Sequence, residues 1–505
     1  MGDMKKVKSI LSAFFEVPFS FFSLPEMNKK FFFVFGCYLL ALSSLFLADY
    51  FHTGDDFVRA WNAIRRWSGG GRHLNDYIGY AMNFSYYHRD ITPIVNILAL
   101  TFLTSATLIL TYTITGALTY RALLGGLALG LSPYFLQNLS YKFDCAFFCL
   151  SLLWSTLPFL WFNKGRLFYG ALGICTFLIC CTYQATLSIL GMTFLYLLFQ
   201  EYIHGAKIKT LLIKAGITAI IVITVVLGYT YIERQINTNL YTLNRSVLCL
   251  MAENVTCSEV VIRNLTTIWI DFFKDPWQGT PMATLAYLFL GFCLIAFLFK
   301  ALLGISRPRR IIAFCVAPAI FIGMITCIFI WTIFFTEIVQ SPRIFVGVGG
   351  ILAIGLMIFL TLDFSQFPIF GKGMTFLYHV LSYIILWALV VFALRYGNLL
   401  FIQWEYDRYK LSRIEHELGK LPYGDILFKA SPRAPAVLRR YEEYPFYRKL
   451  VLAPPLYYTN FYFGPSYSKC RIKSNKAKSK EIIYQDNEFS LTLLNDYCVL
   501  IDAKQ

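Results

Sequence analysis

Two adjacent carboxylates, Asp55 and Asp56, follow the first long apolar run of the chain. Neighbouring carboxylates repel each other, which raises the pKa of one of them. A carboxylate with a raised pKa can accept a proton from an attacking hydroxyl group. The same residues also suit the start of a helix over 56–67, where Asp55 would be the N-cap. Both interpretations stand for this pair: a catalytic general base and a helix cap.

Basic side chains that could bind a phosphate group come next. Arg72 follows three glycines, 69–71, which allow a tight turn, and its guanidinium fits a pair of phosphate oxygens. No Lys-Ser/Thr follows, so this is not a Walker loop, and a flexible linker explains it equally well. Lys142 could form an ion pair with Asp144 or contact a lipid phosphate. The candidate donor phosphate ligands are Arg59, Arg72, Lys142 and Arg343.

Polar residues near the ends of apolar runs are candidates for substrate binding. Tyr183 and Gln184 form the tip between two short runs, where a polar pair usually satisfies the backbone or faces a cavity. Tyrosines of the C-terminal tail could stack on a ring of a substrate or simply pack. The candidate substrate-binding residues are Asp76, Tyr141, Asp144, Tyr183 and Gln184, and the tail tyrosines are Tyr457, Tyr458 and Tyr462. With six histidines and no zinc-like spacing, we expect no metal site and no cofactor.

The elements that position these residues must be membrane helices. The chain has 505 residues, of which 57% are hydrophobic, 18% aromatic and 15% charged. Soluble domains carry about 25% charged residues, so this composition excludes disorder, a secreted disulfide scaffold and an ordinary cytosolic enzyme. The net charge of +16 is typical of cytoplasmic loops in a membrane protein. No basic stripe lies on a soluble domain, so we expect contact with membrane lipids and not with nucleic acid.

Apolar runs predict an all-α polytopic membrane protein with about eleven transmembrane helices. A basic, Phe-rich segment, 1–30, is expected to lie on the cytoplasmic leaflet, and the membrane domain covers 31–394. The first run spans 31–50. The other ten are centred near Leu103, Leu127, Ser151, Gly173, Phe194, Val222, Leu290, Phe321, Ala353 and Trp387.

Charge in the connections predicts the orientation. The N-terminus is expected in the cytoplasm because five lysines precede the first run, and every even connection is short and basic. The outer segments include the loops 51–91 and 233–280. The C-terminus is then periplasmic, and the tail, 395–505, is long enough for a small α+β domain. The strands expected in it are Glu481–Tyr484, Ser490–Leu494 and Tyr497–Ile501.

Four of the thirteen cysteines lie in polar outer segments. Cys249 and Cys257 share one loop, and Cys470 and Cys498 share the tail. Such pairs can oxidise outside the cytoplasm, so we predict the disulfides Cys249–Cys257 and Cys470–Cys498.

The outer motifs, in this order, resemble the Gtr-type serotype-converting glucosyltransferases of bacteria and their phages. The resemblance is carried by Asp55-Asp56 with Arg59, by Gly71-Arg72, and by Tyr183-Gln184. Its most specific part is the run Asn138-Leu139-Ser140-Tyr141-Lys142-Phe143-Asp144. It covers roughly residues 31–202, and the tail carries no matching motif.

The resemblance implies a GT-C type glycosyltransferase of the bacterial inner membrane. Such an enzyme moves glucose from undecaprenyl-phosphate glucose to lipid-linked O-antigen repeats on the periplasmic face. A companion flippase and a lipid-glucose synthase act upstream, and an acid in the first outer loop serves as general base. Independently of the resemblance, a polyprenyl-phosphate donor needs an outward-facing base and cations, which Asp55 or Asp56 and the basic residues above can supply.

Two other functions fit the same topology. A transporter or flippase would show related halves and charges near the bilayer midplane, whereas the charges here gather at the outer ends of the apolar runs. A lipid-linked polysaccharide polymerase or ligase is the nearest enzymatic alternative, and it would use the lipid-linked polymer as its donor.

Overall fold

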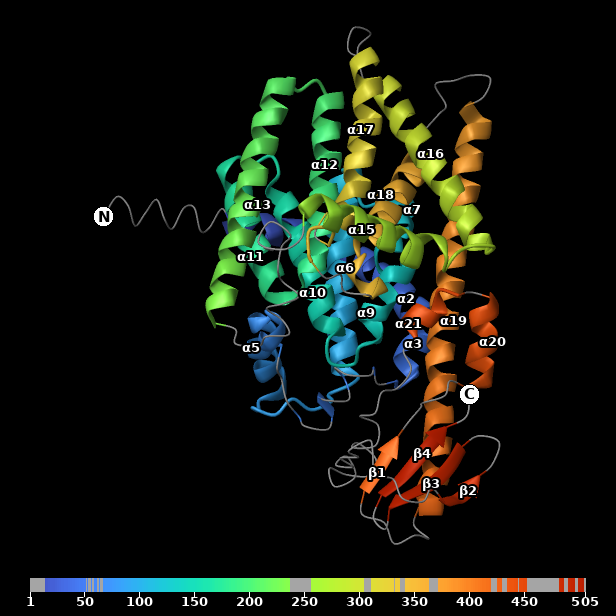
Figure 1. Cartoon of the computed structure of the whole chain (residues 1–505). Coiled ribbons are helices and arrows are strands. Elements are labelled where there is room, and N and C mark those ends of the chain that lie inside the picture. Colours follow the sequence, from blue (N-terminus) through green and yellow to red (C-terminus); the bar gives the residue numbers. More distant parts are fainter. Residues whose placement is uncertain are drawn as a thin grey trace, which may run out of the picture.

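The computed structural model describes residues 14–50, 52, 56, 59–60, 63, 67–236, 256–303, 310–330, 332–336, 341–362, 371–418, 425–428, 434–443, 445–451, 481–485, 489–495 and 498–503. Within these residues the chain is mainly helical, as Figure 1 shows. Long apolar runs favour helices because a helix satisfies every backbone N–H and C=O inside a bilayer.

Six helices in the described part of the chain are long and apolar enough to cross a membrane. They confirm that this is a helical membrane protein. The six are α6 (Ile94–Thr115), α12 (Leu187–Ile203) with the preceding turn η3 (Gln184–Thr186), α13 (Ile208–Ile236), α16 (Pro281–Leu303), α17 (Arg310–Phe329) and α19 (Gly371–Leu418).

Shorter helices occupy the remaining predicted runs. They are α2 (Met27–Ala41) with α3 (Ser43–Leu47), α7 (Tyr120–Gly126) with α8 (Ala128–Leu131), α10 (Cys145–Thr156) with η2 (Leu157–Trp161), α11 (Arg166–Thr182) and α18 (Gly347–Thr361). Each predicted run therefore contains a helix, while the count of about eleven crossings remains a prediction.

Helix α18 lies at the centre of the bundle, and nearly all of its side chains are buried. Small residues allow its neighbours to come close. A Cβ atom added to Gly349 would lie 2.7 Å from the backbone oxygen of Leu129, and one added to Gly125 would lie 2.7 Å from the backbone nitrogen of Met357. Such close backbone contacts are typical of membrane helices, which associate through packing.

The described part of the predicted interfacial segment is helical from residue 14 to residue 22. The ring of Phe14 stacks on Trp161 at 4.8 Å between centroids, and Phe21 packs on Tyr112 at 5.3 Å. Phe15 and Phe19 are exposed on the same segment. This division into a packed and an exposed aromatic face is the one expected for a helix at a membrane surface.

The elements that carry the candidate site connect these helices. They are η1 (Ser68–Gly70), α5 (His73–Asn83), α9 (Pro133–Ser140), α15 (Cys257–Ile268), the π-helical turn η5 (Trp269–Lys274) and η7 (Pro342–Ile344). In Figure 1 the basic connection between α12 and α13 lies at the upper end of the bundle, whereas α5 lies toward the lower end, as does the C-terminal sheet. The predicted inner and outer connections are thus separated in space for these elements.

Helix α19 is 48 residues long and continues through the boundary predicted between residues 394 and 395. The apolar run ends there, but the polar residues that follow still favour a helix, so the hydropathy change does not coincide with a structural break. Two short helices follow, α20 (Pro435–Glu443) and α21 (Tyr447–Leu450).

A four-stranded sheet with the order β1-β4-β3-β2 lies in the tail. Strand β1 (Asp425–Phe428) runs parallel to β4 (Cys498–Ala503), and β3 (Phe489–Asn495) runs antiparallel to both β4 and β2 (Glu481–Gln485). Strands β2, β3 and β4 overlap the three predicted strands, with ends that differ by up to two residues. The sequence analysis missed β1, because its four residues are too few to show an alternating pattern.

Candidate functional site

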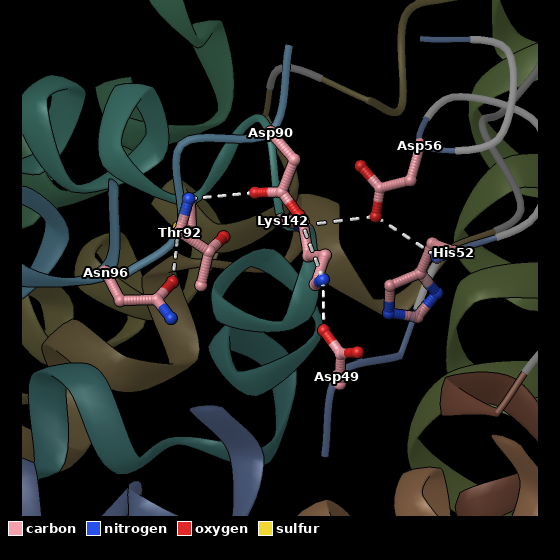
Figure 2. Close-up of polar contacts among 8 residues, drawn as sticks. Asp49, His52, Asp56, Asp90, Thr92, Asn96 and Lys142 are labelled. Atoms are coloured by element: carbon pink, nitrogen blue, oxygen red, sulfur yellow. Dashed lines mark hydrogen bonds and ion pairs between the residues drawn. The ribbon is translucent and has the colours of Figure 1, made fainter. Parts of the chain in front are cut away.

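The buried carboxyl group of Asp56 is the centre of the candidate site (Figure 2). Its Oδ2 accepts hydrogen bonds from the backbone N–H of His52 at 3.1 Å and from that of Lys142 at 3.2 Å. Its Oδ1 has no hydrogen-bond partner among the residues that the structure describes. One carboxylate oxygen is therefore held in place, and the other can accept a proton.

The surroundings of Asp56 bring its pKa close to neutral pH. Burial and then the negative charge of Asp144 raise the pKa of Asp56 to about 7, against the lowering effect of Arg59 and the two backbone N–H groups. A general base works best when its pKa lies near the operating pH.

The second buried carboxylate, Asp144, pairs with Arg59. Arg59 Nη1 donates to Asp144 Oδ2 at 2.8 Å, and the indole Nε1 of Trp67 donates to Asp144 Oδ1. The guanidinium of Arg59 also lies 4.5 Å from the ring centroid of Trp67. Both charged residues are buried. Arg59, Trp67 and Asp144 thus form one packed unit beside Asp56.

Lys142 has different partners from the one considered in the sequence analysis. Its ammonium group bonds to the carboxylate of Asp49 and to Asp90 Oδ2, the latter at 3.1 Å (Figure 2). Burial raises the pKa of Asp90, but hydrogen bonds from Thr92 and the charge of Lys142 outweigh it and leave that pKa lowered. Because two carboxylates surround one ammonium group, Lys142 is a weaker candidate for phosphate than the sequence indicates.

Arg72 and Arg343 lie against a group of aromatic rings. The Arg72 guanidinium is 5.2 Å from the ring centroid of Tyr183, and that of Arg343 is 4.6 Å from the ring centroid of Tyr141. The hydroxyl group of Tyr183 donates to the backbone oxygen of Arg343 at 2.7 Å, and so does Asn138 Nδ2 at 3.0 Å. Residues from four distant parts of the sequence therefore meet here, and they include two predicted phosphate ligands and two predicted substrate-binding residues.

The glycine-rich turn packs against α13. Gly71 adopts a left-handed backbone with φ of 71°, and its carbonyl accepts a hydrogen bond from Tyr229. His73 Nε2 contacts Glu233 Oε2 at 2.6 Å. Gly71 is required here because left-handed backbone is costly for residues with a Cβ atom.

Two of the predicted substrate-binding residues make local structural contacts. Asp76 Oδ2 accepts from the backbone N–H of Ser68 at 2.7 Å, and its Oδ1 accepts from that of Trp67 at 3.3 Å. Gln184 Nε2 donates to the carbonyl of Cys180 at 2.9 Å. These contacts stabilise the η1 turn and the tip before α12.

A polar chain beside Asp56 was missed in the sequence analysis. His52 Nε2 lies 2.5 Å from Ser140 Oγ, which lies 3.0 Å from the hydroxyl group of Tyr396. The imidazole of His52 stacks on Tyr141 with centroids 4.2 Å apart. His52 and Ser140 belong to motifs visible in the sequence, but nothing in the apolar run around Tyr396 marks that residue.

Several predicted residues lie outside the described part of the chain. They are Asp55, Cys249, Cys470, Tyr457, Tyr458 and Tyr462. Cys257 is disulfide-bonded, and the backbone of Cys498 lies in β4, so both pairings remain predictions. Within the described part of the chain, no three His, Cys, Asp or Glu side chains lie close enough together to hold a metal ion.

Comparison with known proteins gives two matches. The family profile of glucosyl transferase GtrII matches residues 44–354, which include Asp56 and all the polar contacts of that residue. A protein of Salmonella phage P22, described as an uncharacterized 55.3 kDa protein in the gtrB 5′ region, is 24% identical over 217 residues. That match covers 43% of this chain and 44% of the phage protein. No solved structure matches the chain.

Proposed function

This chain belongs to the GtrII family of glucosyl transferases, and on that premise we propose that it glucosylates O-antigen. The donor is undecaprenyl-phosphate glucose and the acceptor is a lipid-linked O-antigen repeat of lipopolysaccharide. Transfer takes place on the periplasmic side of the bacterial inner membrane and changes the serotype. The observation that carries the proposal is the buried Asp56 carboxylate with one oxygen fixed and a pKa of about 7.

Asp56 acts as the general base of a single displacement. Its Oδ1 accepts the proton of the acceptor hydroxyl while that oxygen attacks the anomeric carbon of glucose. The bond from the anomeric carbon to the phosphate oxygen breaks, and the configuration at this carbon inverts. Asp144 is less suited to this role, because both of its oxygens already accept hydrogen bonds from Arg59 and Trp67.

Arg72 and Arg343 bind the donor phosphate. The Arg72 guanidinium lies against the ring of Tyr183, whose hydroxyl group donates to the backbone oxygen of Arg343. Arginine binds phosphate with two parallel hydrogen bonds, and fixed positive charge stabilises the phosphate as it leaves. Arg59 and Lys142 act less directly, since carboxylates neutralise their charges.

The topology of the proposal follows the charge pattern. A cytoplasmic N-terminus and a periplasmic C-terminus put the segment 51–91 and Asp56 outside the cytoplasm. A lipid-linked donor is required on that side, so a lipid-glucose synthase and a flippase must act before this protein.

Donor dependence tests the proposal. The full-length protein in lipid nanodiscs is incubated with lipid-linked O-antigen and either synthetic polyprenyl-phosphate glucose or UDP-glucose. We expect a glucosylated acceptor with inverted anomeric configuration only from the polyprenyl donor. Transfer from UDP-glucose alone, or retention of configuration, would overturn the proposed reaction.

A further inference from the structure

Five aromatic side chains near the candidate site are exposed on α5 and the loop after it. We name them the aromatic platform. They are Tyr77 (74% exposed), Tyr80 (42%), Phe84 (94%), Tyr86 (75%) and Tyr87 (63%). The rings of Tyr80 and Tyr86 lie 5.2 Å apart. Exposed apolar clusters of this kind mark interaction sites.

The packing of α5 explains why this platform faces outward. Asn75 and Gly79 lie on the buried side of the helix. A Cβ atom on Gly79 would lie 3.1 Å from the ring of Trp67, so the helix touches Trp67 directly. Tyr77 and Tyr80 are three residues apart and share the opposite side of the helix.

Hydrogen bonds fix the loop that carries the other three rings. Asn83 Nδ2 lies 2.9 Å from Nδ1 of His88, and Asn83 Oδ1 accepts from the backbone N–H of Arg89 at 3.1 Å. The backbone N–H of His88 donates to the carbonyl of Ala63 at 2.9 Å. The Asn83 bonds thus close the loop on itself, and the bond from His88 ties its far end to the structure beneath it.

The aromatic platform is continuous with the candidate active site. The imidazole of His88 meets the ring of Trp67 edge-on, with centroids 4.6 Å apart. Trp67 in turn donates to Asp144, the charge that raises the pKa of Asp56. Trp67, His88 and Asp144 are buried, so the aromatic platform packs on top of the unit that borders the proposed base.

The chemistry of the aromatic platform suits a carbohydrate. Four of the five rings are tyrosines, which offer a flat apolar face and a hydroxyl group at low entropic cost. The polar residues Asn83, Ser85 and Asp90 border them. Tyrosine also occurs in the aromatic belts of membrane proteins, so contact with lipid is the alternative that the binding experiment separates from glycan binding.

We propose that the aromatic platform binds the glycan chain of the acceptor and guides its terminal repeat toward Asp56. This inference rests on the proposed function for the identity of the glycan. The sugar rings would stack on the aromatic faces, and the tyrosine hydroxyl groups would bond to sugar hydroxyl groups.

Direct binding tests the proposal without requiring turnover. The probe is lipid-free O-polysaccharide, released by mild acid from the lipopolysaccharide of the host strain. It is titrated against the full-length protein in lipid nanodiscs by calorimetry. We expect the Tyr77→Ala/Phe84→Ala variant to bind at least tenfold more weakly. The control Tyr231→Ala, which removes an exposed tyrosine of α13, should stay within twofold of the parent.

Kinetics separate this inference from the proposed reaction. In the transfer assay the double variant should raise KM for the acceptor while leaving KM for the donor unchanged. If transfer fails entirely but the platform variants still lose glycan binding, the reaction is wrong and the binding site stands. Unchanged glycan affinity in the double variant overturns the inference. The tryptophan fluorescence of a Phe84→Trp variant gives a second test. If brominated lipids quench this fluorescence and the polysaccharide leaves it unchanged, the platform is a membrane contact and the inference is overturned.

Discussion

Arg59 and Asp144, 85 residues apart in sequence, form a buried ion pair with 2.8 Å between Nη1 and Oδ2. The pair lies beside Asp56 and acts on it with opposite signs, since Asp144 raises the pKa of Asp56 and Arg59 lowers it. The proton affinity of the proposed base therefore depends on whether both members of the pair are present.

Asp144→Asn should shift the pH dependence of transfer. It removes the charge that raises the pKa of Asp56 and leaves the lowering charge of Arg59 in place. Activity needs ionised Asp56 and rises with pH through about 7, so the acidic limb of kcat/KM should move to lower pH by about one unit. A limb that stays in place or moves to higher pH would contradict this account. The exposed residue Asp275 provides the control, Asp275→Asn, which should leave the profile unchanged.

Asp56→Asn should stabilise the protein in alkaline buffer while it removes activity. Burial raises the folded-state pKa of Asp56 from 3.8 to about 7, so the folded state favours the protonated form. Stability is therefore lost as the pH rises from 3.8 to about 7, and above that range the loss reaches up to about 4 kcal/mol, at 1.36 kcal/mol for each pKa unit. Thermal unfolding in nanodiscs should show a higher Tm for the variant at pH 8.5 and a much smaller difference at pH 5. Equal differences at both pH values would refute the raised pKa.

Arg72 and Arg343 should contribute more to donor use than Lys142. Arg72→Ala and Arg343→Ala each remove a guanidinium that we assign to the phosphate, and we expect kcat/KM for the polyprenyl donor to fall by about tenfold or more. Lys142→Ala should have the smaller effect, because two carboxylates already bind its ammonium group. Initial rates at varied donor concentration decide the order. A larger loss for Lys142→Ala would return that residue to the phosphate site.

The four outer cysteines should be oxidised in the isolated protein. Alkylation without reductant, followed by mass spectrometry, should show the linked peptides Cys249–Cys257 and Cys470–Cys498. Cys293, a buried thiol, becomes alkylated only after unfolding and serves as the free-thiol control. Alkylated thiols at Cys470 and Cys498 under native conditions would exclude the second pairing.

Hydropathy predicted the helices of this fold, because the apolar runs that form membrane helices can be seen locally in the sequence. The sequence also placed Asp56 and Asp144 among the candidate site residues, since both lie in polar motifs at the ends of such runs, and the structure puts their carboxylates close enough to interact. It did not identify their partners. Lys142 binds carboxylates 93 and 52 residues away, and Ser140 contacts Tyr396 across 256 residues. Such pairs depend on how the helices pack, which no local pattern encodes.

The conformation of the short segments that connect the helices could not be predicted from the sequence either. The carboxylate of Asp76 could bind a substrate, yet it accepts hydrogen bonds from the backbone N–H groups of Trp67 and Ser68. The left-handed backbone of Gly71 could be anticipated from the glycine triplet, whereas its contact with Tyr229 of α13 could not.

The initial rate of glucose transfer by Asp56→Asn tests the central claim most directly. The assay uses radiolabelled polyprenyl-phosphate glucose, purified lipid-linked O-antigen and the full-length protein in nanodiscs at pH 8. Asp275→Asn is the matched control, and Tm confirms folding of both variants. We predict a rate lower by about 10² to 10⁴ for Asp56→Asn and a parent-like rate for the control. A folded Asp56→Asn protein that transfers glucose at the parent rate would contradict the account and place the base elsewhere, with Asp55, Asp76 and Asp144 as the remaining candidates.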